Sequence, residues 1–494
     1  MNIPLVLHTL GNLFLLLSGI LLIPFGVSLF YGTGEEIWAF VFSFIASGIT
    51  GLAFKFFLKP KKEDITIREG LAIVAFWWMF CALFGALPYW FSGTCDTFCD
   101  SYFESMSGLT TTGASIFNDI EALPHGILFW RSMTQWLGGM GIVVFFVAIL
   151  PTIGVGGHKL FSAEAPDLTT DKIKPRIAQT AKILWVIYLS LTAILIPLLW
   201  FGGMEFFDAI CHAFTTISTG GFSTKNQSIA AFDSLFIEIV IMVFVFIAGC
   251  NFILYYQLVT GKFKRVLANS EIRFFVSLML CAICLVTLAL FFFDSNFYNG
   301  GVKDHNYDSV GGALRYAAFQ TVSIMTSAGY CNADFDLWPD FCRVFLVLLM
   351  FIGGCAGSTA GGMKVARIML LCKSGVRELF HVLRPRAIMH VKLSGKPVSE
   401  DIITNTLGFI VINLGLFGVF SLILTIFGTE LITSFSAIAS MMSNVGPALA
   451  DAGATKNYSG IAYPCKWVLI FAMLVGRLEI YTVILIFLPL TWKK

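Results

Sequence analysis

Long apolar runs alternate with short polar segments along the whole chain. A helix needs about 20 apolar residues to cross the roughly 30 Å hydrocarbon core of a membrane. Runs near that length are Pro4–Tyr31, Ile37–Phe57, Leu71–Phe91, Ile127–Leu150, Ile183–Phe201, Leu235–Val259, Phe274–Phe293, Val344–Ile352 with a glycine tract beyond it, Ile402–Phe427 and Trp467–Leu490. The pattern therefore predicts an all-α polytopic membrane protein.

Composition supports this interpretation. Hydrophobic residues make up 57% of the 494 residues, charged residues only 13%, and the mean hydropathy is +0.83, whereas soluble domains carry about 25% charged residues. The N-terminus has neither a cationic leader nor a small-residue cleavage site, so we expect the first apolar segment to be retained.

Charge distribution predicts the topology. Most Lys and Arg residues lie in 55–69, 158–182, 262–273, 364–401 and the C-terminal end. These segments face the cytoplasm by the positive-inside rule, which places both termini there. The opposite side carries an excess of Asp and Glu. An anionic outer face raises the local concentration of a cation, although membrane proteins also avoid outer Lys and Arg for other reasons.

One short block occurs four times in register. The blocks are "SGLTTTGAS" (107–115), "TTISTGGFS" (215–223), "SIMTSAGYC" (323–331) and "SMMSNVGPA" (440–448), and they share the glycines Gly113, Gly221, Gly329 and Gly446. Hydroxyls stand six positions before each glycine (Ser107, Thr215, Ser323, Ser440) and three before it (Thr110, Ser218, Thr326, Ser443). Two before it stand Thr111, Thr219, Ser327 and Asn444.

Each block lies between two hydrophobic segments on the acidic side. The order helix, re-entrant half-helix, loop, helix therefore recurs four times in one orientation, which implies an axis along the membrane normal. Non-helical backbone persists at membrane depth only where it is buried in protein or lines a water-filled path. We therefore expect four parallel helix–pore loop–helix repeats around one central pore, preceded by a two-helix hairpin.

The four loops suit a dehydrated monovalent cation. Glycine adopts positive φ at little cost, so neighbouring carbonyls can turn inward as a ring that replaces a hydration shell. Each half-helix would direct its partially negative C-terminus at the cavity below, and the hydroxyls can bond to backbone groups. The hydroxyls and Asn444 could also supply oxygen ligands. The alternative is that the glycines are helix-packing points.

A second glycine cluster, "GGCAGSTAGG" (353–362), interrupts the next helix of the third repeat. Five glycines in ten residues disfavour a continuous helix, since each costs about 1 kcal/mol relative to alanine. Gly353, Gly357 and Gly361 are also four apart, which is typical of a packing face, and both interpretations stand on the sequence alone. Lys364, just after the tract, could anchor its cytoplasmic end or extend toward the interface.

A charged residue lies in the last apolar segment. A charge inside a membrane span usually faces a partner or a wet cavity. Arg477 could pair with Glu479, although residues two apart on a helix point to different faces. We favour Arg477 facing the pore, donating to carbonyls of the glycine tract and repelling cations in the closed state.

These motifs resemble those of the Trk/Ktr/HKT superfamily of potassium transporters, and most closely its TrkH-type membrane subunit. The resemblance covers nearly the whole chain and is sharpest in "SGLTTTGAS", "WRSMTQWLGGMGIVVFFVAILP" (130–151), "GGFST" (220–224), "FIGGCAGSTAGGMKVARIMLL" (351–371) and "GRLEIYTVILIFLP" (476–489). The leading hairpin also matches this type. Four filter glycines imply a preference for K⁺ over Na⁺ in this family, and some plant relatives that transport Na⁺ have serine at the position of Gly113.

The resemblance implies specific site residues. The expected K⁺-binding filter comprises Thr111, Thr112, Gly113, Thr219, Gly220, Gly221, Ser327, Ala328, Gly329, Asn444, Val445 and Gly446. The glycine tract would be an intramembrane loop across the pore, and the expected gate comprises Gly353, Gly354, Gly357, Ser358, Thr359, Gly361, Gly362 and Arg477. Each repeat has one shared glycine and no full TVGYG, so we expect fewer strong sites and looser K⁺/Rb⁺ discrimination than in tetrameric K⁺ channels.

The resemblance also implies partners and place. It implies that the protein forms a homodimer and lies in the bacterial inner membrane, in contact with its lipid. It also implies a cytosolic TrkA-like nucleotide-binding subunit that controls the gate through ATP or ADP. The basic segment 364–401 is either its docking surface or only a topology determinant. The chain has no GxGxxG or Walker motif opening a helix, so we expect no cofactor bound by it, K⁺ as substrate, and no nucleic acid partner.

The predicted units are a hairpin (1–68), repeat 1 (69–157), repeat 2 (158–261), repeat 3 with the glycine tract (262–373), and a basic connector with repeat 4 (374–494).

We expect no enzyme, because no HExxH or metal-ligand cluster occurs and Ser358 has no histidine base nearby. The predicted function is gated K⁺ uptake. The alternative is a symporter coupled to H⁺ or Na⁺, although such carriers usually place several ionisable groups at mid-membrane. Cys95 and Cys99 could form a disulfide or a metal site, but most cysteines fit as small core residues.

Overall fold

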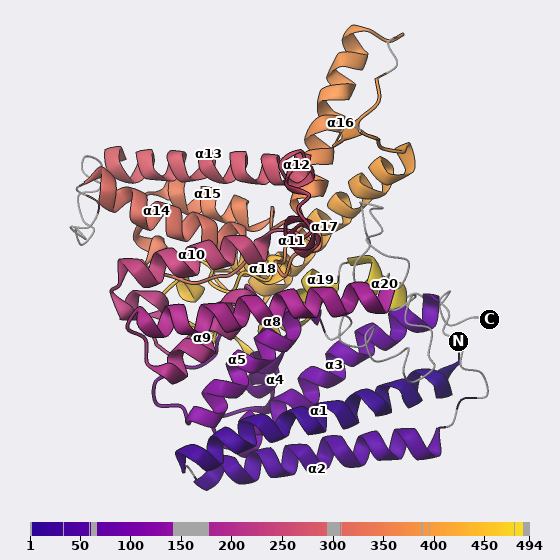
Figure 1. Cartoon of the computed structure of the whole chain (residues 1–494), viewed down its shortest axis with the longest axis vertical. Helices are drawn as coiled ribbons and strands as arrows, with labels where there is room; N and C mark the ends of the chain where they lie inside the picture. Colours follow the sequence, from indigo (N-terminus) through magenta and orange to yellow (C-terminus); the bar gives the residue numbers. More distant parts are fainter. Residues whose placement is uncertain are drawn as a thin grey trace.

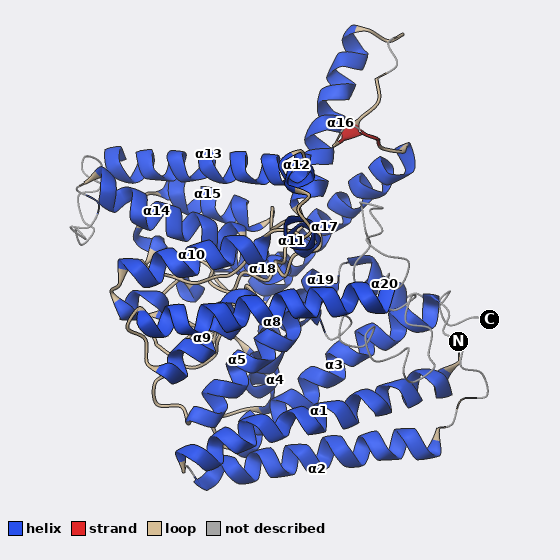
Figure 2. Ribbon diagram, in the orientation of Figure 1, coloured by secondary structure: helices blue, strands red, loops and turns tan. Residues whose placement is uncertain are grey.

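The computed structural model describes the chain except residues 1, 33, 59, 61–66, 142–176, 294–306, 308, 387, 388, 395, 479 and 488–494. The described chain is almost entirely helical, and a short antiparallel ribbon of β1 (Lys392–Leu393) and β2 (Lys396–Pro397) lies beside α16 (Figure 2). The predicted boundary between repeats 1 and 2, at 157/158, lies outside the described residues.

Two antiparallel helices form one edge of the bundle (Figure 1). They are α1 (Ile3–Tyr31) and α2 (Gly34–Phe57), which pack along their length. Small residues permit this, because a Cβ added at Gly11 would lie 2.9 Å from the carbonyl oxygen of Gly51, and one at Gly51 the same distance from that of Gly11. The Ser47 hydroxyl also donates to the Phe14 carbonyl at 2.9 Å.

Four units follow with the same order of helices. The long first helices are α3 (Ile67–Phe91), α8 (Ile177–Phe201), α13 (Ser270–Phe293) and α17 (Glu400–Ile426). The short helices that follow them, here called pore helices, are α4 (Phe98–Leu109), α9 (Phe206–Ile217), α14 (Val310–Met325) and α18 (Leu431–Ser443). The second helices are α5 (His125–Gly139), α10 (Leu235–Gly249), α15 (Asp340–Met350) and α19 (Tyr463–Leu478). This is the predicted hairpin followed by four parallel repeats.

The other elements connect or extend these units. They are α11 (Phe252–Val259), α12 (Phe263–Leu267), α16 (Val365–Leu383), α20 (Ile480–Phe487) and the 3₁₀ turns η1 (Ser228–Phe232), η3 (Phe335–Leu337) and η4 (Ala450–Ala452). Helix α16 projects away from the helical bundle (Figure 1).

The second segment of repeat 2 differs from the prediction. Among the described residues six helices are long and apolar enough to cross a membrane (α1, α2, α3, α8, α13 and α17), and the apolar run Leu235–Val259 is not a single straight helix. It divides into α10 and α11, bent by 96°. The Asn251 side chain causes a new start, because its Oδ1 accepts from the backbone N–H of Ile253 at 2.9 Å and caps α11.

Ion pairs join neighbouring repeats near the ends of the pore helices. Arg315 of α14 donates to both carboxylate oxygens of Glu238 of α10, at 2.7 and 2.9 Å, and so connects repeats 2 and 3. Lys466 of α19 donates to Asp100 of α4 at 2.6 Å and connects repeat 4 back to repeat 1. A buried pair is costly to break from one side, because the remaining charge is left without its partner.

This geometry predicts the effect of removing one side of the second pair. Lys466→Met leaves Asp100, whose side chain is 13% exposed, without its cation, and we expect a loss of about 3 kcal/mol in unfolding free energy. Thermal unfolding in detergent measures it. Asp100→Asn should add little in the Lys466→Met background, and Lys456→Met, on an exposed loop residue, should change little. An unchanged melting temperature for Lys466→Met would contradict this assignment.

Candidate functional site: four central loops and a glycine tract

The four repeated blocks share one backbone conformation. Just after each pore helix comes a polar residue with positive φ, at 53° for Thr111, 51° for Thr219, 56° for Ser327 and 52° for Asn444. The shared glycine, two residues later, is also left-handed, with φ of 82°, 77°, 72° and 102° from repeat 1 to repeat 4. The left-handed region costs a non-glycine residue roughly 1–2 kcal/mol. Its presence in all four repeats indicates that the surrounding structure enforces it.

The residue between these two positions is tied back to its own pore helix. Its backbone N–H donates to the carbonyl of the residue six before the glycine, at 2.8–2.9 Å in every repeat. The donor–acceptor pairs are Thr112–Ser107, Gly220–Thr215, Ala328–Ser323 and Val445–Ser440. These bonds close the helix C-termini in the manner of a Schellman motif.

The loops meet in a closed cycle. A Cβ added to Gly113 would overlap the carbonyl oxygen of Gly220 in repeat 2, and one on Gly221 would overlap that of Ala328 in repeat 3. The cycle continues from Gly329 to Val445 and from Gly446 back to Thr112. Each shared glycine thus lies against the carbonyl preceding the next shared glycine. We call these four carbonyls the carbonyl ring. Close approach as well as positive φ requires glycine here.

Several flanking hydroxyls bond to backbone. Three before the glycine, Thr110 donates to the Met106 carbonyl and Thr326 to the Val322 carbonyl, both at 2.7 Å. Six before it, Ser323 donates to the Tyr330 carbonyl at 2.8 Å, whereas the buried Ser107 hydroxyl has no hydrogen-bond partner among the described residues.

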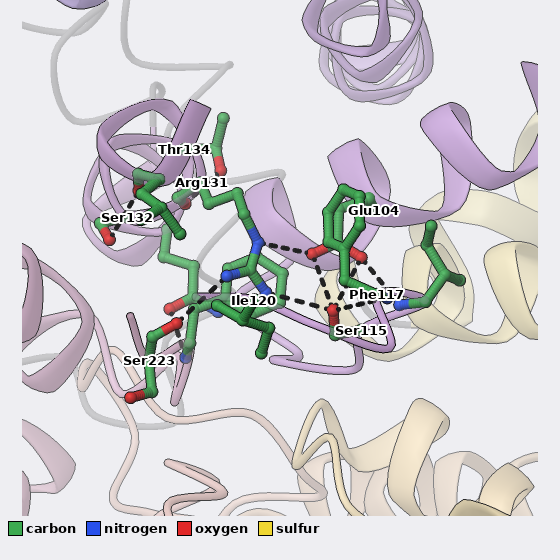
Figure 3. A network of polar contacts seen from close by, with 12 residues as sticks. Glu104, Ser115, Phe117, Ile120, Arg131, Ser132, Thr134 and Ser223 are labelled. Atoms are coloured by element: carbon green, nitrogen blue, oxygen red, sulfur yellow. Dashed lines mark hydrogen bonds and ion pairs between the residues drawn. The ribbon is translucent and has the colours of Figure 1, made fainter. Parts of the chain in front are cut away.

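A buried ion pair supports the first two loops (Figure 3). Arg131 of α5 donates through Nε to Glu104 of α4 at 2.8 Å, and the two side chains are 1% and 0% exposed. Glu104 also accepts from the Ser115 hydroxyl and the Ile116 N–H, and Arg131 donates to the Ser223 carbonyl of repeat 2 at 3.1 Å. Each group compensates the charge of the other, so neither is buried without a partner.

This support was not predicted from the sequence, although the repeats carry a signal for it. The residue nine before the shared glycine contacts the residue two after it in three repeats. The pairs are Glu104–Ser115, His212–Ser223 and Gln320–Cys331, with closest distances of 3.2, 3.0 and 3.9 Å. A search of the aligned repeats for polar pairs would have found them.

The glycine tract 353–362 is not helical. It is held by backbone bonds to the break between α10 and α11, from Cys355 N–H to the Gly249 carbonyl at 2.9 Å and from Phe252 N–H to the Gly357 carbonyl at 3.1 Å. Glu271, which the sequence analysis missed, accepts from the Ala356 N–H at 2.7 Å.

The tract lies directly against the four central loops. The Gly361 N–H donates to the Ser327 hydroxyl. The Thr359 hydroxyl donates to the Ile217 carbonyl at 3.1 Å and accepts from the Thr219 hydroxyl at 3.3 Å. Thr359 is buried, whereas Ser358, also predicted at the gate, is partly exposed and bonds within its own turn. Lys364 folds back and donates to the Ala360 carbonyl.

Arg477 connects three repeats. It donates through Nη1 to the Thr359 carbonyl at 2.9 Å, and through Nη2 to the carbonyls of Gly138 and Gly139, the latter at 3.0 Å. The Thr359 contact is of the kind expected from the sequence, whereas the contacts to the end of α5 were not anticipated. An arginine at a helix C-terminus satisfies its free carbonyls and its partial negative charge. Glu479, the other suggested partner, lies outside the described residues.

The predicted cysteine site receives no support from the described part of the chain. Cys95 and Cys99 are free and buried, and no group of three or more metal-ligating side chains occurs among the described residues.

Comparison with known proteins gives the same fold and a family. A family model described as TrkH, a cation transport protein, matches residues 37–493. The Trk system potassium uptake proteins TrkH of Salmonella typhimurium (strain LT2) and Escherichia coli (strain K12) are each 40% identical over 498 residues, with full coverage of both chains. The crystal structure of the potassium transporter TrkH from Vibrio parahaemolyticus matches with a TM-score of 0.87 at 37% identity, again over the whole of both chains. These likenesses confirm the predicted helical membrane fold, and the chain belongs to the TrkH family of cation transport proteins.

Proposed function

We propose that this protein carries K⁺ into the cell through a gated pore between the four central loops. The observation that carries the proposal is the closed cycle in which each shared glycine lies against a carbonyl of the next repeat. The relatives named above are potassium uptake proteins, which supports K⁺ as the cation that this protein transports.

The four central loops would act as the selectivity filter. Their backbone oxygens replace part of the hydration shell of K⁺, and the four pore helices end at the loops with their partially negative C-termini. The side-chain oxygens of Thr111, Thr219, Ser327 and Asn444, two before each glycine, are further candidate ligands. Because each loop has one shared glycine, discrimination between K⁺ and Rb⁺ should be loose.

The glycine tract and Arg477 would form the gate. The tract is bonded to the loops through Ser327 and Thr359, and Arg477 joins the Thr359 carbonyl to the end of α5. The guanidinium also places a positive charge beneath the filter, where it repels a cation. Opening requires that these bonds break, and the glycines give the tract freedom to move.

Control would come from the cytoplasmic side. The basic segment 364–401 includes α16, which projects from the bundle and offers a docking surface for a TrkA-like subunit that binds ATP or ADP (Figure 1). A homodimer in the bacterial inner membrane, with both termini in the cytoplasm, completes the proposal.

The filter assignment is tested by Gly113→Ser in vesicles that contain the purified protein alone. Wild type should pass K⁺ and Rb⁺ down their gradients faster than Na⁺ and Li⁺. The serine Cβ overlaps the Gly220 carbonyl, so the K⁺/Na⁺ flux ratio should fall by about tenfold, equivalent to roughly 1.4 kcal/mol.

Gly460→Ser is the matched control, because a Cβ there meets open space and φ is not positive. If Gly113→Ser keeps the wild-type ratio, the loops are not the filter. If wild type moves K⁺ only with an imposed H⁺ or Na⁺ gradient, the protein is a coupled symporter.

The gate assignment is tested by Arg477→Ala. Loss of the link between the Thr359 carbonyl and α5 should raise basal K⁺ flux by about tenfold or more without a regulatory subunit, since each lost charge-assisted bond is worth about 1.5–3 kcal/mol and about 1.4 kcal/mol is tenfold. Arg384→Ala, which removes an exposed arginine at the end of α16, should leave basal flux unchanged. Equal flux in Arg477→Ala and wild type, at equal folded protein, would rule out this role.

A further inference from the structure

One face of α5 holds the filter loop of the neighbouring repeat. Arg131 and Gln135 are four residues apart on this helix and so lie on the same face. Arg131 contacts repeat 2 through the Ser223 carbonyl and stacks its guanidinium 4.2 Å from the centre of the Phe222 ring. Gln135 is completely buried and reaches the same loop nearer to the carbonyl ring.

The Gln135 amide makes two hydrogen bonds that bracket a filter glycine. Its Nε2 donates to the Gly220 carbonyl at 2.7 Å, and its Oε1 accepts from the Phe222 N–H at 3.1 Å. These backbone groups belong to the peptides on either side of Gly221. Because one amide supplies both a donor and an acceptor, it restrains the orientation of both peptide planes.

Gly220 is matched in size to this side chain. A Cβ added to Gly220 would overlap Cδ and Oε1 of Gln135. The corresponding residues of the other loops, Thr112, Ala328 and Val445, all carry side chains. The backbone of Gly220 does not have positive φ, so the neighbouring amide is the steric reason for glycine at this position.

The corresponding position in repeat 4 lacks this amide. Gly138 and Gly476 are equivalent, because a Cβ on each would overlap the carbonyl four residues before the shared glycine of its own repeat, that of Leu109 or Met442. Three residues before them stand Gln135 and Met473. A methionine side chain cannot donate a hydrogen bond. The two residues therefore occupy equivalent positions in repeats 1 and 4, but only Gln135 can bond to a filter carbonyl.

We propose that Gln135 is a positioning residue that raises K⁺ selectivity by fixing one quarter of the carbonyl ring. The proposal rests on the potassium filter proposed above. A carbonyl that cannot tilt is unable to follow a smaller ion inward, so Na⁺ is coordinated less well than K⁺. The Gly220 oxygen retains a second lone pair for the ion.

The first experiment compares Gln135→Met with wild type, Gly113→Ser and Ser132→Ala in vesicles, with K⁺ and Na⁺ fluxes measured on the same preparation. Methionine has similar volume and occurs at the equivalent site of repeat 4. A flux ratio does not depend on the amount of folded protein, so a merely structural role would not change it. The K⁺/Na⁺ ratio of Gln135→Met should fall by about three- to tenfold, the equivalent of one neutral hydrogen bond.

Ser132→Ala is the matched control, because that buried hydroxyl donates to the Leu128 carbonyl of its own helix at 3.1 Å. Its ratio should equal that of wild type. If Gln135→Met also keeps the wild-type ratio while Gly113→Ser loses it, the role of Gln135 is refuted and the filter stands. If wild type itself shows no preference for K⁺, both this inference and the proposed filter fail.

A second experiment uses the size match and keeps the test valid if Gln135→Met does not fold. Gly220→Ala should lose K⁺/Na⁺ selectivity by clashing with the amide, and Gln135→Ala in the same chain should restore part of it by making room. A double variant with a ratio above that of Gly220→Ala supports the contact as the cause. A double variant with a ratio no better than that of Gly220→Ala overturns it.

Discussion

The contact between each shared glycine and the carbonyl of the next repeat is the constraint on which the other features of the four central loops depend. Four loops of different sequence take the same two left-handed positions because only that conformation brings glycine Cα and neighbouring carbonyl together in all four seams. The residues around the ring keep this geometry. Backbone bonds to the pore helices hold the residue before each shared glycine. The ion pair between Glu104 and Arg131 supports the first two loops just after their shared glycines.

The proposed gate is bonded to the same four loops. Ser327 and Thr219, which hold left-handed positions at the ends of pore helices, are also the side chains that contact the glycine tract. Movement of the tract therefore removes bonds from the loops themselves. If the tract and the loops act as the proposed gate and filter, opening changes the restraints on the filter, and selectivity and gating are then not independent properties.

Much of this architecture could be predicted from the sequence, because it depends on local sequence patterns that recur in all four repeats. The shared glycines and the hydroxyls before them follow from residue type and register. For the tract 353–362 the sequence left a loop and a helix-packing face equally open, and only the family resemblance favoured the loop. The bend at Asn251 was missed, because hydropathy counts apolar side chains and does not detect a polar side chain that caps a new helix. Gln135 and its fit to Gly220 were missed for another reason. The two residues are 85 positions apart, and among the described residues their contact occurs in one seam, so neither spacing nor repetition indicates it.

In the part of the chain that the structure describes, the Gln135 contact occurs in one of the four seams, which has a consequence for how the proposed pore can change. In an assembly of four identical subunits, any substitution in the filter changes all four filter segments at once, so a small change in ion preference is difficult to make. Here the four quarters are encoded separately within one chain. A single codon change alters one quarter and leaves three as they were, which allows ion preference to be graded in small steps and each step to be compensated by its own neighbour.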